Sequence, residues 1–432
     1  MRRESLPRAV PETREDSTHI VEEWARSGVM SLCGGREPDP SPAAAYAVFA
    51  AQLRALTSDL GIPATTDWAD PGLVLSARAA ELGGHRRGQT SCNGSTRLFR
   101  LRKGWWAVTL ARPSDHELVP ALLERELVGE SPWKAIATES QRRGPELVER
   151  AAMLGLAAGL LGCASAPCTT TSTRIADRLR RPLSGALVLD FSALWAGPLA
   201  TALLAEAGAH VVKVEWTSRP DGARHGSPRF FDWLNSSKNM FGVDDLADEH
   251  ALRRLVDRAD IVIESSRPRA LRQRGLSVES LRQPPGRVWV RITAHGACPS
   301  QEHRIGFGDD AAVSGGLVAK SESGPAFMAD AIADPLTGVR VAHEVCRSLR
   351  QGGGELIDVT LGGVASQFAE LLPSPGAHGV AVHEVQGQWH VEVGGRFTPV
   401  KAPVPAPQRR NASAVGQDNA AVLTRWGAGT PT

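Results

Sequence analysis

The sequence predicts an α/β protein built on a doubly wound, Rossmann-like parallel sheet, with a smaller α/β domain beside it. Short apolar runs typical of buried parallel strands recur after residue 182. Segments with helical apolar spacing separate these runs, so strands and helices alternate. The length of 432 residues also exceeds what one hydrophobic core usually serves, so we expect more than one domain.

Five short apolar runs are the predicted strands of the parallel sheet. They lie at 186–190, 211–215, 260–264, 288–293 and 355–361. Helical patterns cover 199–207 and 333–350, and another helix is expected to begin near Glu249. The glycines at 352–354 stand between a helix and a strand, so we interpret them as a helix end and a tight turn.

The first part of the chain mixes helical and strand patterns. Helical spacing covers 43–60 and 146–161, and a strand pattern covers 105–110 after a turn at Lys103 and Gly104. A stretch rich in Thr, Ser and Arg then resembles a linker. We expect a frayed start (1–17), a smaller α/β domain (18–165), a linker (166–181), a Rossmann-like domain (182–365) and a Pro- and Gly-rich closing segment (366–432).

Composition, charge and cysteine spacing argue against nucleic-acid, membrane and metal binding. The formal net charge is only +2, which does not favour a nucleic acid or an anionic membrane as partner. The sequence holds no apolar run of about 20 residues and begins without a signal-peptide pattern, so we expect a cytoplasmic protein. Its six cysteines lack metal-ligand spacing, so we expect free thiols and no metal.

Ligand binding is expected at the turns that follow the predicted strands. In doubly wound sheets, ligands bind at the carboxyl ends of the strands. Four turns occupy such places, at 195–198, 216–224, 265–268 and 295–307. None of them carries a Walker loop or a dinucleotide fingerprint, and no HExxH or GxSxG motif occurs in the chain.

These turns carry motifs that resemble the family III coenzyme A transferases, also called the CaiB/BaiF family. The motifs are VLDFSALWAGPLATALLAEAGAHVVKVE, WLNSSKN, ADIVIESSRPRALRQRGL, GFGDDAAVSGGLV and IADPLTGVRVAHEV, and GGGELIDVTL follows them. The resemblance covers 183–361, and 400–427 is similar to the family's ending. The family's small domain usually lies between the core and that ending. Here similar pieces precede the core, so we expect a rearranged or partial small domain at the N-terminus.

The resemblance implies a covalent nucleophile at Asp334. In the family, an Asp at a helix start attacks the thioester carbonyl and gives a mixed anhydride, which coenzyme A then converts into an enzyme-bound thioester. Gly338, four positions further on, fits the family's pattern. From the residues alone, Asp334 before Pro335 is more typical of a helix cap than of a nucleophile, and the family resemblance reverses that preference. Asp330 is the weaker candidate.

The resemblance also implies contacts with coenzyme A, mostly through the backbone of the turns. Arg267 and Lys238 would pair with its phosphates, although both are also typical of solvated surface cations. Backbone N–H groups at Gly315 and Gly316 are a candidate oxyanion site. The implied contact residues are Trp195, Ala196, Lys238, Val243, Asp244, Asp245, Leu246, Ser265, Ser266, Arg267, Arg304, Ile305, Gly306 and Phe307.

The implied activity is transfer of coenzyme A from an acyl-CoA to a free carboxylic acid, in a homodimer that the family's topology suggests is interlocked. Two alternatives stay open. A 2-methylacyl-CoA racemase would need a His beside Gly306, where Phe307 stands, although His295 and His303 are near in sequence. A non-catalytic coenzyme A-binding subunit is the other. The sequence leaves the acyl donor and acceptor open.

Overall fold

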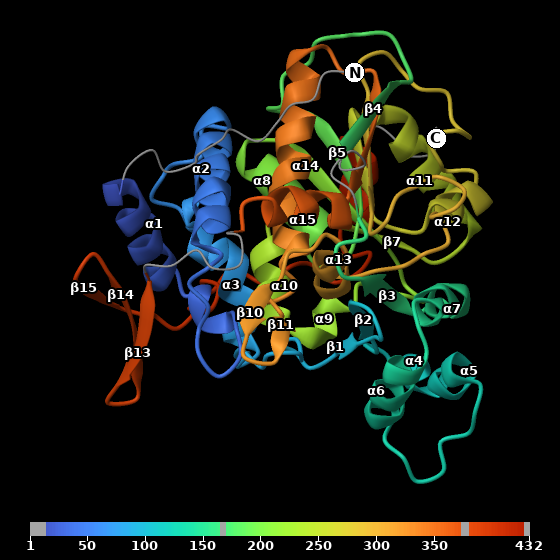
Figure 1. Cartoon of the computed structure of the whole chain (residues 1–432). Coiled ribbons are helices and arrows are strands. Elements are labelled where there is room, and N and C mark those ends of the chain that lie inside the picture. The colour runs from blue at the N-terminus through green and yellow to red at the C-terminus, as the bar shows by residue number, and fades with distance from the viewer. Residues whose placement is uncertain (1–13, 165–169, 373–379, 427–432) are drawn as a thin grey trace.

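The computed structural model describes residues 14–164, 170–372 and 380–426, of which 14–17 and 268 are described in their backbone only (Figure 1). A seven-stranded sheet with the order β4-β12-β9-β8-β5-β6-β7 forms its centre. Six strands are parallel, and β4 pairs antiparallel with β12 at one edge. The strands are β4 (Thr170–Arg174), β5 (Leu187–Phe191), β6 (His210–Trp216), β7 (Asn239–Val243), β8 (Ile261–Glu264), β9 (Val288–Thr293) and β12 (Glu355–Thr360).

This strand order confirms the predicted doubly wound sheet. The chain builds outward from β5 through β6 to β7, then returns to the other side of β5 and continues from β8 through β9 to β12. The direction of building therefore reverses between β5 and β8. In such sheets the crevice at the carboxyl ends of those two strands is where ligands bind.

Helices cover both faces of the sheet, which explains why its strands are apolar on both sides. Val188 of β5 belongs to a hydrophobic cluster that includes α8 (Ala196–Glu206) and α14 (Ala333–Arg350). Leu189, the next residue, belongs to a second cluster that includes α11 (Leu246–Arg258). Successive side chains point to opposite faces of a strand, so both faces are buried.

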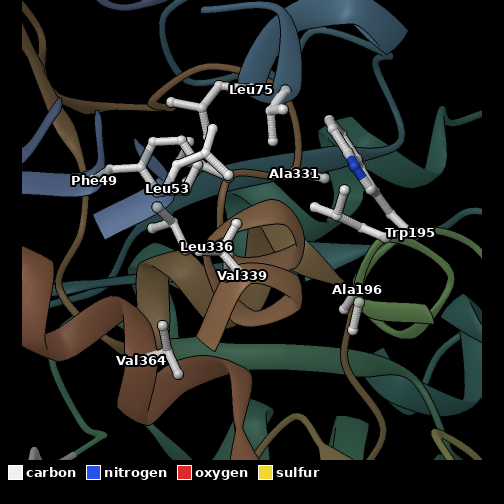
Figure 2. Close-up of a cluster of buried hydrophobic side chains, with 14 of the residues drawn as sticks. Phe49, Leu53, Leu75, Trp195, Ala196, Ala331, Leu336, Val339 and Val364 are labelled. Carbon is white, nitrogen blue, oxygen red and sulfur yellow. The ribbon is translucent and has the colours of Figure 1, made fainter. Parts of the chain in front are cut away.

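The N-terminal helices complete the core on the face covered by α8 and α14. They are α1 (Arg14–Arg26), α2 (Ala43–Asp59) and α3 (Pro71–Glu81). Figure 2 shows Phe49 and Leu53 of α2 pointing toward Leu336 and Val339 of α14, with Leu75 of α3 nearby. This part of the chain therefore shares its core with the central sheet.

Residues 96–160 form a separate module with a hydrophobic cluster of their own (Figure 1). Its antiparallel sheet has the order β1-β2-β3. The predicted domain at 18–165 thus contains two parts that pack differently, and its limits stay a prediction. The elements of the module are β1 (Thr96–Arg100), β2 (Trp105–Thr109), α4 (Pro113–Glu117), α5 (Val119–Leu123), α6 (Pro132–Arg142), α7 (Glu146–Leu154) and β3 (Ala157–Leu160).

Three local predictions need correction. The helix predicted over 146–161 ends at Leu154, because Gly155 adopts a left-handed conformation (φ 73°) and strand β3 follows. The predicted linker at 166–181 contains β4, a largely exposed strand at the edge of the sheet. Its Thr and Ser residues lack the apolar pattern by which buried strands are predicted from sequence. Helix α1 already begins at Arg14, inside the predicted frayed start, while 1–13 lie outside the described residues.

The remaining elements surround these units. The C-terminal sheet β13-β14-β15 lies against α1, and α16 lies against β7. Among the described helices, none is long and apolar enough to cross a membrane. The other elements are two 3-10 turns (Met30–Leu32 and Asp67–Ala69), α9 (Ala223–Gly226), α10 (Pro228–Asn235), α12 (Pro268–Gln273), α13 (Gly308–Ser314), β10 (Ala319–Ser321), β11 (Gly324–Ala326), α15 (Leu361–Ala369), β13 (Ala381–Val385), β14 (Gln388–Val393), β15 (Arg396–Pro399) and α16 (Asn419–Arg425).

Candidate active site

The turn after β5 lies at the point where the strand order reverses. The Ala193 N–H donates to Ser265 Oγ (3.2 Å), which joins the turns that follow β5 and β8. Leu194 adopts a left-handed conformation (φ 68°), an uncommon one for a branched side chain, and Trp195 then opens α8. Trp195, Ala196 and Ser265, all predicted contact residues, are therefore brought together here.

A network of buried ion pairs holds the turn after β5 in place. Asp190 pairs with Lys238 Nζ (3.1 Å), and Lys213 Nζ pairs with Asp221 (2.9 Å) and donates to the Ser192 carbonyl (2.7 Å). Burial alone would raise the pKa of Asp190, but the attraction of the two lysines outweighs it and lowers that pKa to about 2. The network stays charged and anchors the crevice.

The surroundings of Lys238 do not suit the phosphate contact expected from the sequence. Its ammonium has no exposed surface and donates to Asp190, to the Pro198 carbonyl (2.9 Å) and to Asn235 Oδ1 (2.8 Å). These three acceptors use all three of its N–H bonds. We therefore assign Lys238 a structural role in place of the expected contact.

Asp334 lies in the first turn of α14, with its N–H donating to the Ala331 carbonyl (2.8 Å). Its carboxylate accepts a hydrogen bond from the Gly308 backbone, and burial raises its pKa to about 7. A Cβ on Gly308 would lie 2.5 Å from Asp334 Oδ2, so only glycine permits this approach. Gly338 likewise lets α14 lie close to α8, since its Cβ would lie 2.7 Å from the Ala196 carbonyl oxygen.

Three more carboxylates surround Asp334. Asp309 accepts from the Ala331 N–H (2.8 Å), and Asp310 accepts from the Phe307 N–H (2.9 Å) and from Thr109 Oγ1 (3.0 Å). Burial raises the pKa of both to about 7. Asp330 is also buried, at 1% exposure, whereas Asp334 keeps an exposed edge. Asp334 is thus the least buried of the four carboxylates.

Arg78 is a site residue that the sequence analysis missed. It projects from α3, and its Nε and Nη2 donate to both oxygens of Asp330 (2.8 and 2.7 Å). Its guanidinium also lies over the Trp195 ring, 5.1 Å from the centroid. The only sequence signal is an arginine among small and apolar residues in PGLVLSARAAE, which indicates a buried charge without naming its partner.

A cluster of arginines stands where the module at 96–160 meets the central sheet. Burial lowers the pKa of Arg267, and the like charges of Arg269, Arg112 and Arg219 lower it further. Arg112 also lies over the Phe307 ring, 5.6 Å from the centroid. Within the described chain, none of the four forms an ion pair. This arrangement suits a polyanionic ligand.

The other predicted contact residues divide between two places. Asp244, Asp245 and Leu246 follow Val243 at the end of β7, which β6 separates from β5. There Asp244 accepts from Thr217 Oγ1 (2.7 Å), and Asp245 caps α11. By contrast, Arg304, Ile305, Gly306 and Phe307 lead into α13, and Ser266 and Arg267 follow β8. These latter residues lie on the elements that form the crevice.

Two further candidates from the sequence are not supported by their geometry. The Gly315 N–H donates to the Ala311 carbonyl (2.9 Å) and the Gly316 N–H to the Val313 carbonyl (2.9 Å), so neither is free to bind an oxyanion. Burial and Arg304 lower the pKa of His295 to about 3, which makes it a weak base for racemisation. No group of metal-ligating side chains occurs in the described part of the chain.

Comparison with known proteins finds a family match for part of this chain. Residues 183–391 match the sequence model of CoA-transferase family III. The chain is 29% identical over 215 residues to a succinyl-CoA–D-citramalate CoA-transferase of Chloroflexus aurantiacus, covering 46% of this chain and 54% of that protein. It is 31% identical over 205 residues to a probable fatty acyl-CoA transferase of Mycobacterium tuberculosis, covering 43% and 52%.

A solved structure of a CAIB/BAIF family protein from Brucella suis is 25% identical, covers 50% of this chain and 65% of that one, and has a TM-score of 0.41. The chain spans about half the length of the curated relatives it matches. The matched segment contains the crevice turns, Arg267 and Asp334. Over its residues 183–391, slightly less than half of its length, this chain is similar to the family III coenzyme A transferases.

Proposed function

We propose that this chain transfers coenzyme A from an acyl-CoA to a free carboxylic acid, with Asp334 as the covalent nucleophile. The observation that carries the proposal is the setting of Asp334: it keeps an exposed edge at the sheet's crevice, while Asp309, Asp310 and Asp330 are buried and occupied. With its pKa near 7, a large fraction of Asp334 is ionised at neutral pH, as a nucleophile must be.

The reaction would proceed in four balanced steps. An Asp334 oxygen attacks the thioester carbonyl and expels the coenzyme A thiolate, which leaves a mixed anhydride. The thiolate attacks the Asp334 carbonyl of that anhydride and releases the donor acid. The acceptor carboxylate then attacks the aspartyl thioester and expels the thiolate again. Finally the thiolate attacks the acceptor acyl carbon, which frees Asp334, so the acyl groups stay activated and no water is consumed.

We assign the arginine cluster to the phosphates of coenzyme A. Replacing Arg267 or Arg112 with Gln should each weaken coenzyme A binding by about tenfold, since a charge-assisted hydrogen bond contributes about 1.5–3 kcal/mol. Titration calorimetry at low and high salt measures this, and the salt dependence should shrink in each variant. Arg142→Gln is the matched control, because Arg142 is 67% exposed and pairs with Glu139 of its own helix α6. Unchanged affinity in both cluster variants would contradict the assignment.

Mass spectrometry of the intact protein and of its peptides tests the covalent step. The purified chain is incubated with acyl-CoAs that include those named for its relatives, succinyl-CoA and formyl-CoA, and is then quenched and digested. We expect a coenzyme A adduct on the peptide that contains Asp334. Binding of coenzyme A without any adduct would overturn the proposal and favour the racemase or the non-catalytic subunit. The homodimer and the cytoplasmic location remain predictions, and light scattering tests the first.

A further inference from the structure

The positive charge that favours ionisation of Asp334 most strongly comes from the N-terminal part of the chain. Its charged neighbours are Asp330 on the preceding turn, Asp309 and Asp310 on α13, and Arg78 on α3. Of these, Asp330 and Asp310 disfavour ionisation of Asp334, and Arg78 opposes them. The thiol of Cys92 also lies in this group, near Asp330 and Asp309.

The position of Arg78 is fixed from two sides. The bidentate ion pair with Asp330 sets the plane of the guanidinium, and the Trp195 ring at 5.1 Å covers it. Burial disfavours its charge, but Asp330, Asp309 and Asp334 outweigh this and raise its pKa. Arg78 therefore remains a cation with little freedom to move, beside the helix start that carries Asp334.

The same ion pair holds an uncommon backbone turn. Ala329 (φ 55°) and Ala331 (φ 44°), on either side of Asp330, adopt left-handed conformations that L-residues disfavour. The Ala331 N–H donates to Asp309, and the Ala331 carbonyl accepts from the Asp334 N–H. With Asp330 bound to Arg78 and Ala331 bound to Asp309, the turn presents Asp334 in one orientation.

We propose that Arg78, through its pair with Asp330, is a positioning residue that holds the turn presenting Asp334 and supplies the positive charge facing that carboxylate. The inference rests on the proposed function, since it concerns the nucleophile of that reaction. It assigns the segment before the matched residues 183–391 a part in the chemistry, because α3 contributes a group that the matched segment does not contain.

Three variants separate this role from simple packing, with the pH dependence of kcat as the readout. Arg78→Met removes the cation that favours ionised Asp334. The fall of kcat at low pH (the acid limb of the profile) should therefore move to higher pH by at least about one unit. Asp330→Asn removes an acid, so the limb should move to lower pH. Arg78→Lys keeps the charge but loses the bidentate bond, so its limb should stay near that of the parent while kcat falls. KM for the acyl-CoA should change less than kcat in all three.

A fourth variant distinguishes an electrostatic effect of Arg78 from a folding defect. Arg78→Met leaves Asp330 buried without a partner, which destabilises a protein strongly, whereas Arg78→Met with Asp330→Asn leaves no unpaired charge. The double variant should fold, and its acid limb should return toward that of the parent. If all variants lose activity with an unmoved acid limb, Arg78 serves only the packing and the inference is overturned.

An infrared titration makes the test independent of turnover. The protonated-carboxyl band that disappears in Asp334→Asn reports the ionisation of Asp334 directly. It should titrate at higher pH in Arg78→Met and at lower pH in Asp330→Asn, and equal midpoints would overturn the inference. If the parent forms no adduct with acyl-CoA while these shifts occur, the proposed function fails and the electrostatic role of Arg78 stands.

Discussion

Replacing Asp334 with Asn should lower kcat for coenzyme A transfer by at least about 10⁴-fold, since no later step can begin without the nucleophile. Coenzyme A should still bind, because its phosphates are assigned to arginines on other elements. Steady-state assays and calorimetry on the same preparation measure both quantities. No coenzyme A adduct should form on the variant. Turnover within tenfold of the parent would refute the role of Asp334.

The stability of this variant should not fall, which distinguishes a catalytic loss from a folding defect. Burial raises the pKa of Asp334 to about 7, against about 4 for an unfolded Asp. The folded state thus holds a proton between these values that the unfolded state has lost, so the ionisable group lowers stability as pH rises from about 4 to about 7. Asn removes that loss, and the Tm at pH 8 should equal or exceed that of the parent.

Asp310→Asn is the matched control for Asp334→Asn. Asp310 belongs to the same group of carboxylates, but it is fully buried and accepts from the Phe307 N–H and Thr109 Oγ1. An amide oxygen can continue to accept both bonds, so the loss of activity should be far smaller. An equal loss in both variants would mean that the cluster as a whole, and not Asp334, carries the reaction.

The central sheet was predictable because its strands are buried on both faces. The run at 288–293 is β9 residue for residue, and the helix predicted at 333–350 is α14. Such segments are long or apolar enough for periodicity alone to define them. Strand β4 was not predicted for the opposite reason. It lies at the sheet edge, where its Thr and Ser residues contact little of the hydrophobic core, so the composition of this segment resembles that of a linker.

The candidate site could be proposed from the sequence only where motif and strand order point to the same turns. The crevice turns and Asp334 follow from the strand order and the family resemblance, but ion pairing is a property of three-dimensional contact. Lys238 has the sequence pattern of a surface cation and lies buried against Asp190. Arg78 and Asp330 are 252 positions apart, so no local pattern connects them. Charged side chains were therefore the least predictable part of the site.

The buried pair of Asp190 and Lys238 leads to the largest expected effect on stability. Asp190→Ala should lower the free energy of unfolding by about 3–5 kcal/mol, because it leaves the ammonium of Lys238 buried without its counter-charge. Chemical denaturation at pH 7 measures the loss. Asp59→Ala is the matched control: Asp59 and its partner Arg350 are each 57% exposed, so removing that pair should change stability by less than about 0.5 kcal/mol.

The contribution of Asp190 to stability should decrease at low pH. The folded-state pKa of Asp190 is about 2, below the unfolded value near 4, so its contribution is complete above about pH 4 and is lost as pH falls through about 2. Acid denaturation of the parent should therefore steepen in that range, and the Asp190→Ala variant should lack this step. Because Asp190 also accepts from the Ser192 N–H (2.9 Å), the variant should bind coenzyme A more weakly at any pH where it is folded. A variant as stable as the parent, with unchanged binding, would show that the network does not anchor the crevice.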